Sequence, residues 1–196
     1  MRTRYIPIFR RRREGKTDYA SRKKIVLGKI PFVAPRISNK NISVQIIRPT
    51  IQGDRVLVSA HARELSKMGW KGSLKATPAC YLVGLLAGLR APKSELTKAV
   101  LYLGIKPYVR NSRIAAMVKG LRDGGLNITA NETTFPGDER ISGVHISNWA
   151  EKILETKIRR PIFSKEFKKG FAPSQLQSHF SDIRNNLIKS IGGGSG

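Results

Sequence analysis

Residues 78–89, PACYLVGLLAGL, decide the fold of this chain of 196 residues. From Ala79, apolar side chains recur at intervals of three, four and seven residues, which is the spacing of one face of an α-helix. Further leucines stand beside that face, so we expect the helix to be mostly buried. Pro78 is tolerated in a first helical turn. Gly84 and Gly88 allow a strand or another helix to approach closely.

Three strand patterns precede this helix. Apolar residues from Ile42 to Ile46 alternate with polar ones, a period of two that gives a strand one apolar and one polar face. The expected strands are Phe32–Ile37, Ile42–Arg48 and Val56–Ala60. Pro35 places the first strand at an edge or a bulge. A turn at residues 38–41 follows this strand, and a loop through Pro49 follows the second, so we predict an antiparallel meander.

Helical and strand patterns alternate in the rest of the chain. The expected elements are a helical turn near Arg63–Met68, a strand at Val100–Leu103, a helix capped by Asn111 or Ser112 and ended by Gly124, a strand at Leu126–Ile128, a helix after Gly143, and a helix from Pro173 with Leu176, Phe180, Ile183 and Leu187 on one side. A meander followed by such alternation indicates an α/β fold, with one mixed β-sheet and helices packed on it.

Several side chains fit packing roles. The residues that we expect to pack in the core are Trp70, Trp149 and Cys80. Phe163, Phe167 and Phe171 stand among basic residues, and we favour anchoring of this segment to the domain over stacking on bases. His61 and His179 have no acid or nucleophile at motif spacing, and they fit a structural role and an RNA-facing role equally well.

The chain is strongly basic. It has 37 Lys and Arg against 13 Asp and Glu, a formal net charge of +24, and both ends are more basic per residue than the middle. The densest segment is Arg10–Lys24, RRRREGKTDYASRKK. Unpaired cations are costly to bury, so this segment favours a polyanion such as nucleic acid over a disordered tail or a localisation signal. We expect residues 1–16 to be extended without a partner, and Thr17 to cap a short helix that stops at Gly28.

Catalytic classes find little support in the sequence. Gly15-Lys16-Thr17 is like the end of a phosphate-binding loop, but Arg10 stands where that motif needs a glycine. A two-metal nuclease needs converging carboxylates, and residues 31–60 contain only Asp54. Asp138, Glu139 and His145 match no standard metal-ligand spacing. We therefore expect no catalysis, cofactor, metal or small-molecule substrate.

The single cysteine and the length of the apolar runs indicate in which cellular compartment the protein is expected. The single cysteine, Cys80, excludes an internal disulfide framework and fits a reducing compartment. The start of the chain lacks the apolar region of a secretory signal, and the longest apolar run, around residues 80–89, is too short to span a bilayer. We expect a soluble, cytoplasmic protein with no membrane partner.

Five segments taken together resemble one family. They are RRRREGKTDY at 10–19, the turn SNKN at 38–41 with its following strand, VSAHARELSKMGW at 58–70, TPACYLVGLLAGLRA at 77–91 and PGDERISGVHISNWAE at 136–151. In this order, over roughly residues 1–155, they are similar to the archaeal form of ribosomal protein L-eighteen, the large-subunit protein that binds 5S rRNA. The resemblance implies an α/β fold of the ribonuclease-H-like kind, a basic N-terminal arm that lies on RNA, and extensions beyond the bacterial core.

The resemblance also implies particular RNA contacts. In the arm they are Arg10, Arg11, Arg12, Arg13, Lys16, Thr17, Tyr19 and Arg22, and at the first hairpin they are Arg36, Ser38, Asn39 and Lys40. To these we add Lys23, on the polar face of the expected short helix, and Asn41, at the hairpin tip. Arginine pairs with phosphate through two hydrogen bonds, lysine supplies a point charge, and hydroxyls can bind phosphate or 2′-hydroxyl groups.

The expected organisation has four parts. They are a basic RNA-binding arm with a helix start at 1–24, the α/β core at 25–156, a basic phenylalanine-containing helical extension at 157–191 and a flexible tail at 192–196. The resemblance implies that the partners are 5S rRNA, large-subunit rRNA and neighbouring ribosomal proteins in the central protuberance of the large ribosomal subunit. Two alternative functions stay open, a metal-dependent RNA-processing hydrolase on the same scaffold and a nonspecific polyanion-binding protein or RNA chaperone.

Overall fold

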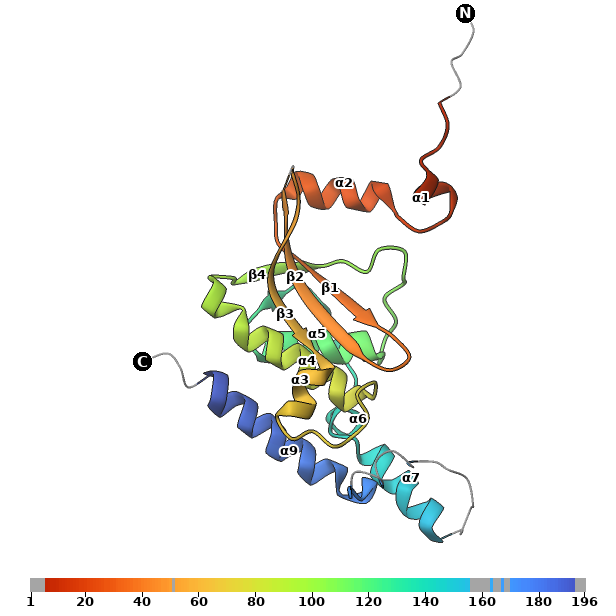
Figure 1. The fold of residues 1–196 in the computed structure, drawn as a ribbon, viewed down its shortest axis with the longest axis vertical. Coiled ribbons are helices and arrows are strands. Elements are labelled where there is room, and N and C mark those ends of the chain that lie inside the picture. Colours follow the sequence, from red (N-terminus) through yellow and green to blue (C-terminus); the bar gives the residue numbers. More distant parts are fainter. Residues whose placement is uncertain (1–5, 51, 156–162, 164–166, 168–169, 193–196) are drawn as a thin grey trace, which may run out of the picture.

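The computed structural model describes residues 6–50, 52–155, 163, 167 and 170–192. Its strands are β1 (Phe32–Ile37), β2 (Ile42–Thr50), β3 (Gly53–His61), β4 (Lys98–Leu101) and β5 (Asn127–Ile128). Its α-helices are α1 (Arg10–Arg13), α2 (Tyr19–Gly28), α3 (Ala62–Lys67), α4 (Thr77–Arg90), α5 (Arg113–Asp123), α6 (Asp138–Ser142), α7 (Val144–Glu155) and α9 (Leu176–Leu187). Shorter helical turns lie at Pro92–Ser94, Glu132–Thr134, Pro173–Gln175 and Ile188–Gly192. The predicted α/β fold is confirmed (Figure 1).

The five strands form one mixed sheet in the order β3-β2-β1-β4-β5. β1 pairs antiparallel with β2, and β2 with β3, which confirms the meander. β4 is parallel to β1, and β5 is parallel to β4. The pairing of β1 with β4 covers only Phe32 and Val33, so within the described residues this edge of β1 is open from Ala34 onward. Pro35, which has no N–H to donate, therefore stands at an open edge, as predicted.

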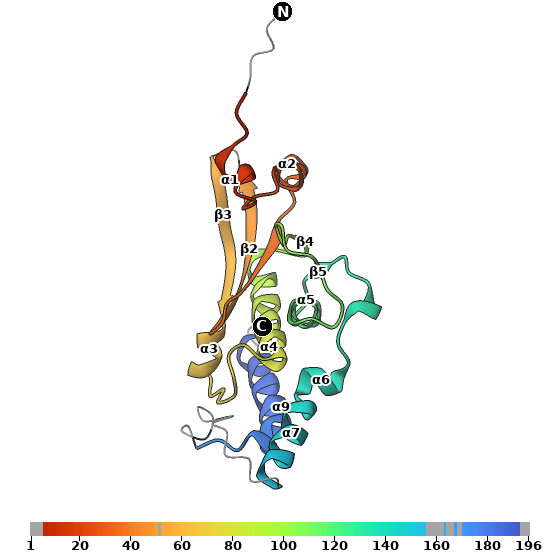
Figure 2. The ribbon, with the colours of Figure 1, turned by 90° about the vertical axis from the view of Figure 1, so that its right-hand side faces the viewer.

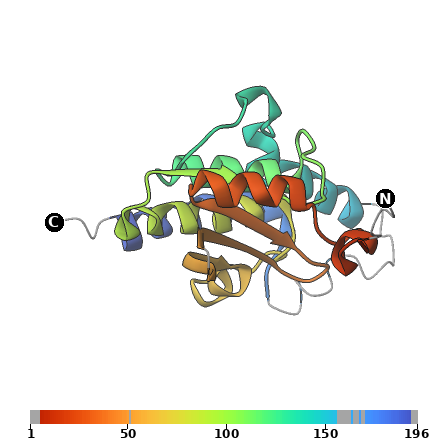
Figure 3. The same cartoon turned by 90° about the horizontal axis from the view of Figure 1, so that it is seen from above.

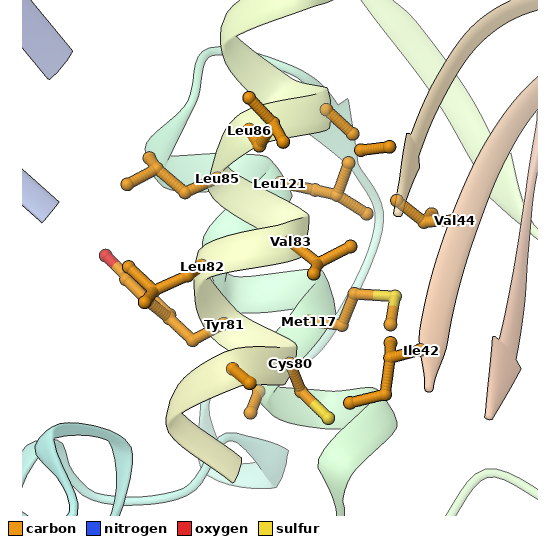
Figure 4. Close-up of a cluster of buried hydrophobic side chains, with 14 of the residues drawn as sticks. Ile42, Val44, Cys80, Tyr81, Leu82, Val83, Leu85, Leu86, Met117 and Leu121 are labelled. Carbon is orange, nitrogen blue, oxygen red and sulfur yellow. The ribbon is translucent and has the colours of Figure 1, made fainter. Parts of the chain in front are cut away.

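Helices α4 and α5 cover one face of the sheet (Figure 2). α4 is buried along most of its length, from Thr77 to Gly88. Its apolar side chains meet those of α5 and β2 in the core, where Figure 4 shows Met117 and Leu121 from α5 and Ile42 and Val44 from β2 around them. The predicted buried helix is confirmed, and Cys80 lies in this core as expected.

Glycines set the distance between α4 and α5. A Cβ atom added at Gly84 would lie 2.1 Å from the Met117 carbonyl oxygen, and one added at Gly120 would lie 2.2 Å from that of Tyr81. Real Cβ atoms do not approach a backbone oxygen so closely, so both positions require glycine. The close approach predicted for α4 is confirmed, and its partner is α5.

The C-terminal helix completes the core. The buried side chains of α9 are Leu176, Phe180, Ile183 and Leu187, as predicted. Phe180 lies 5.7 Å from the Tyr81 ring, measured between centroids, so α9 packs on α4. Phe171 is buried in the same cluster, which confirms anchoring at that position, whereas Phe167 is exposed. Most of residues 157–169, and the expected flexible tail beyond Gly192, lie outside the described residues.

Some local predictions are corrected. The loop predicted through Pro49 is wrong, because a β-bulge between Ile46 and Ile47 shifts the alternation and buries Ile47 and Pro49 within a longer β2. The strand predicted from Val100 begins two residues earlier. Trp149, expected in the core, has 52% of its surface exposed.

Helix α2 lies at the end of the β2–β3 hairpin that is remote from α3 (Figure 1). Seen from above, α1 and α2 lie over the top of the molecule (Figure 3). No residue of α2 is buried. The sheet therefore presents the N-terminal basic segment at one end of the fold.

Candidate nucleic-acid interface

The arginine run forms a helical turn instead of the extended arm that we expected for residues 10–13. α1 exposes all four of its arginines. Glu14 supports this turn, because its carboxylate accepts hydrogen bonds from Arg10 Nε (2.7 Å) and Lys16 Nζ (2.8 Å). These two bonds hold the pKa of Glu14 below its ordinary value. One carboxylate thus offsets part of the repulsion between like charges, although the gain is modest because these pairs are exposed to solvent.

The cap of α2 is Asp18 and not Thr17, which corrects the prediction. Asp18 Oδ1 accepts from the backbone N–H groups of Ala20 (2.9 Å) and Ser21 (3.2 Å). Asp18 Oδ2 accepts from the Ser21 hydroxyl at 2.5 Å, and the hydrogen bonds from Ser21 contribute most to lowering the pKa of Asp18. The Thr17 hydroxyl instead accepts from Arg11 Nε at 2.8 Å, so Thr17 ties α1 to α2.

Arg22 has a role in the fold that the sequence did not reveal. Its guanidinium forms an ion pair with Asp54 at the start of β3. It also lies over the Phe32 ring, with 5.2 Å from Cζ to the ring centroid. Arg22 therefore fixes α2 to two strands of the sheet, and only 27% of its side chain is exposed. No local sequence pattern connects residues 22 and 54, so only the tertiary structure reveals this contact.

The remaining cations of the predicted site face solvent. Arg12, Arg13, Lys23, Arg36 and Lys40 are all exposed. Among the described residues, none of these five side chains has a hydrogen-bond or ion-pair partner within the protein. They are the cations of the interface that are best placed to meet an external anion.

The β1–β2 turn is built as predicted. The Ser38 N–H and hydroxyl both donate to the Asn41 carbonyl oxygen, at 2.9 and 2.8 Å, and the Asn41 N–H donates to the Ser38 hydroxyl oxygen at 3.0 Å. These bonds leave Asn39 and Lys40 exposed at the tip. Ser38 is thus occupied within the turn, while Asn39, Lys40 and the neighbouring Arg36 are available to a partner.

The arm and the turn lie on the same side of the molecule, with the turn farther from α2 (Figure 1). Both also face the viewer in Figure 2. In the described parts of the chain, no hydrogen bond or ion pair joins α1 to the turn. The structure thus presents two separate basic elements on one side, which suits a partner as extended as an RNA helix.

Two of the acidic residues weighed for a hydrolase take part in ion pairs. Asp54 pairs with Arg22, and Asp138 accepts from Lys119 Nζ at 2.6 Å. The Lys119 contact holds the pKa of Asp138 below its ordinary value. Within the described residues, no group of three or more His, Cys, Asp or Glu side chains is placed to hold a metal ion.

Two histidines have structural roles. His61 caps α3, because its Nδ1 accepts from the Arg63 N–H at 3.0 Å. The His179 ring stacks on Trp70, with 5.2 Å between centroids, and its Nε2 accepts from the Lys71 N–H at 3.1 Å. The sequence left open a structural role and an RNA-facing role for both histidines, and the structure shows that both have the structural one.

Comparison with known proteins adds to this geometry. Residues 3–98 match the family described as "Ribosomal large subunit proteins 60S L5, and 50S L18". The large ribosomal subunit protein uL18 of Methanothermobacter thermautotrophicus is 43% identical over 189 residues, which cover 96% of this chain and 97% of that protein. The chain belongs to the uL18 family.

Other members of the uL18 family agree. The protein of the same name from Aeropyrum pernix is 42% identical over 94% of this chain and 87% of that protein, and the one from Staphylothermus marinus is 41% identical over 92% and 91%. These archaeal relatives confirm the resemblance drawn from the five segments. They also extend it beyond residue 155, into the C-terminal part of the chain. In the described part of this uL18-family chain, no helix is long and apolar enough to cross a membrane.

Proposed function

We propose that this chain is a structural, non-enzymatic component of the large ribosomal subunit in the cytoplasm, where it binds 5S rRNA and helps to attach it to the large rRNA in the central protuberance. The observation that carries the proposal is a set of five exposed cations on a member of the uL18 family, none of which has a hydrogen-bond or ion-pair partner among the residues that the structure describes: Arg12, Arg13, Lys23, Arg36 and Lys40. The strand order, with an antiparallel β3-β2-β1 meander extended by parallel β4 and β5, supports the ribonuclease-H-like fold type.

Charge neutralisation supplies most of the affinity in this proposal. Each phosphate that Arg12, Arg13 or Lys23 neutralises releases counterions, so affinity falls steeply as salt rises. Arginine can grip a phosphate through two parallel hydrogen bonds, which fixes direction as well as distance. Arg10, Arg11 and Lys16 are already bonded to Glu14 or Thr17, so they contribute charge and hold the shape of the arm.

The β1–β2 turn fixes the register of the protein on the RNA. Its tip offers a cation at Lys40 and an amide at Asn39, and Arg36 stands on the adjacent open edge of β1. An amide side chain can both donate to phosphate and bind a 2′-hydroxyl group, which distinguishes RNA from DNA. Two separated contact elements restrict the RNA shapes that can touch both at once, which favours one structured RNA over others.

A competition experiment tests the proposal. Labelled 5S rRNA bound to the full chain is challenged with unlabelled 5S rRNA and with bulk tRNA, and we expect 5S rRNA to displace the label at a much lower concentration. Replacing both Arg12 and Arg13 with Gln should weaken 5S binding and make it less dependent on salt. The logarithmic slope should fall by about 0.7 to 0.9 for each phosphate that is no longer neutralised.

The matched control removes the same charge elsewhere. Lys67 on α3 and Lys189 near the C-terminus are exposed and lie outside the interface, so replacing both with Gln should change 5S affinity far less. Equal competition by tRNA, or equal reductions of affinity in the two double variants, would show that the chain binds polyanions without a placed site.

A further inference from the structure

A depression opens between the arm and a loop that is distant in sequence. Its volume is about 480 Å³, and its lining residues are Arg12, Gly15, Thr17, Asp18, Tyr19, Ala20 and Ile105. Ile105 belongs to the segment between β4 and α5, which rises toward α1 in Figure 1. The volume lies within the roughly 300–1,000 Å³ that is usual for small-molecule sites, so the depression can hold one flat ring system.

The depression presents apolar surface at a place where the chain is otherwise highly charged. Tyr19 is 37% exposed and Ile105 is 54% exposed. The ring of Phe9 lies 5.4 Å from that of Tyr19, measured between centroids, but Phe9 does not line the depression. Phe9 therefore supports the Tyr19 ring without filling the space beside it. An exposed aromatic ring next to a cation, here Arg12, is the usual platform for an unstacked base.

The charges around the depression distinguish a base from a phosphate. The Asp18 carboxylate lines it, and a phosphate beside this carboxylate would be repelled. A carboxylate has about four acceptor sites, and Asp18 uses three of them for Ala20 and Ser21. One site is left for an amino or imino group of a base, while Arg12, which also lines the depression, can meet the phosphate of the same nucleotide.

We infer that this depression receives one unpaired RNA base, which stacks on Tyr19, contacts Ile105 and donates a hydrogen bond to Asp18. The inference rests on the proposed function for its natural ligand, since 5S rRNA would supply the base. The rest of the interface contacts the RNA backbone, and this depression adds a site that recognises a base. A base with a donor edge (guanine, adenine or cytosine) fits Asp18 better than uracil, which has a single imino donor flanked by two carbonyl oxygens.

The test compares Tyr19→Ala, Tyr19→Phe and Ile105→Ala in the full chain on two RNAs. One is 5S rRNA, and the other is a short single-stranded RNA that contains the fluorescent base 2-aminopurine. Tyr19→Ala should weaken binding to 5S rRNA by roughly 5- to 150-fold, the range for loss of one stacked base, with the salt dependence unchanged because the phosphates stay neutralised. Tyr19→Phe keeps the ring that stacks, so it should restore most of the affinity that Tyr19→Ala loses.

Ile105→Ala distinguishes the loss of the base site from misfolding of the arm. Ile105 lies on a different segment from α2, so Ile105→Ala should expose the same single 5S base to reagents that modify Watson–Crick edges as Tyr19→Ala does. The parent chain should quench 2-aminopurine on binding, and Tyr19→Ala should not. If the parent prefers tRNA to 5S rRNA but still quenches, the proposed function fails and the base site stands. If neither RNA responds to Tyr19→Ala, or the two variants expose different bases, the base site is wrong.

Discussion

The guanidinium of Arg22 lies against the carboxylate of Asp54, 32 residues farther along the chain. This contact joins α2 to the start of β3, and the Phe32 ring beneath the guanidinium adds a cation–π contact. Because Asp18 caps α2, and Thr17 binds Arg11, the ion pair also fixes the direction of α1 relative to the sheet. The basic arm is therefore held by the core at its base.

Replacing Asp54 with Asn should reduce the preference of the chain for 5S rRNA over tRNA. The change makes the chain more positive, so electrostatics alone would strengthen binding to any RNA. Loss of the ion pair frees α2 and the arm, however, and a placed contact becomes a mobile one. A partly exposed ion pair contributes about 0.2–1 kcal/mol, so we expect the preference to fall by up to about fivefold. Competition binding measures it.

Asp138→Asn is the matched control for this prediction. It adds the same charge and also breaks an ion pair, with Lys119, but on α6 away from the arm. We expect it to leave the ratio of 5S to tRNA affinity unchanged. An equal drop in both variants would mean that Arg22 and Asp54 do not orient the arm.

Replacing Gly84 with Ala should destabilise the fold. The added Cβ would stand 2.1 Å from the Met117 carbonyl oxygen, so α4 and α5 must move apart and the core must repack. Overpacking of this kind costs about 1–3 kcal/mol or more, measured as a lower midpoint in urea unfolding. Gly28→Ala is the control, because a Cβ there meets nothing within 4 Å. A Gly84→Ala midpoint no lower than that of Gly28→Ala would contradict the packing.

The fold should lose stability as pH falls below about 6.5, in part through His179. Burial, and next the Lys71 charge, hold the pKa of His179 below its ordinary 6.5. The unfolded chain therefore binds this proton more readily, so the contribution of the neutral ring is complete above pH 6.5 and declines as pH falls toward the folded pKa. Protonation would also place a proton on Nε2, where the Lys71 N–H now donates. Thermal unfolding at pH 7.5 and 5.5 measures the loss.

Two histidine variants separate the contributions to this loss. Burial, with the Arg140 charge, also lowers the pKa of His145, so His179→Gln should flatten the pH dependence partly and the double variant with His145→Gln should flatten it further. If His179→Gln has the same difference in Tm between the two pH values as the parent chain, His179 is not the group that titrates.

The sequence predicted elements whose signals are local. The alternation from Ile42 to Ile46 and the helical spacing from Ala79 placed β2 and α4 close to their observed bounds. Ser38 and Asn41 marked the turn because serine and asparagine bond readily to nearby backbone. The sequence did not, however, predict correctly which of two neighbouring residues with similar capping ability would cap α2. Thr17 and Asp18 are both good caps; the structure uses Asp18, while the Thr17 hydroxyl is bonded to Arg11.

Features that depend on tertiary contacts could not be predicted. The ion pair of Arg22 with Asp54, and the approach of Ile105 to the arm, join segments that no periodicity relates. The bulge at Ile46 and Ile47 leaves no recognisable pattern in the sequence. Without it, Pro49 could not be recognised as part of β2 and was predicted to lie in a loop. For the site, residue type and clustering indicated the cations, but only the structure separates those bonded within the protein, such as Arg10, from those, such as Arg12, that have no bonding partner among the described residues.

Hydroxyl-radical footprinting of 5S rRNA with the full chain, and with a chain that lacks residues 1–17, tests the central claim most directly. This truncation keeps the Asp18 cap and the Arg22 anchor, so α2 stays on the sheet. We predict that the full chain protects two separate stretches of 5S backbone, and that the truncated chain loses one of them and keeps the one bound by the β1–β2 turn. An unchanged footprint, or the loss of only a uniform background, would contradict an arm that binds 5S rRNA at a defined place.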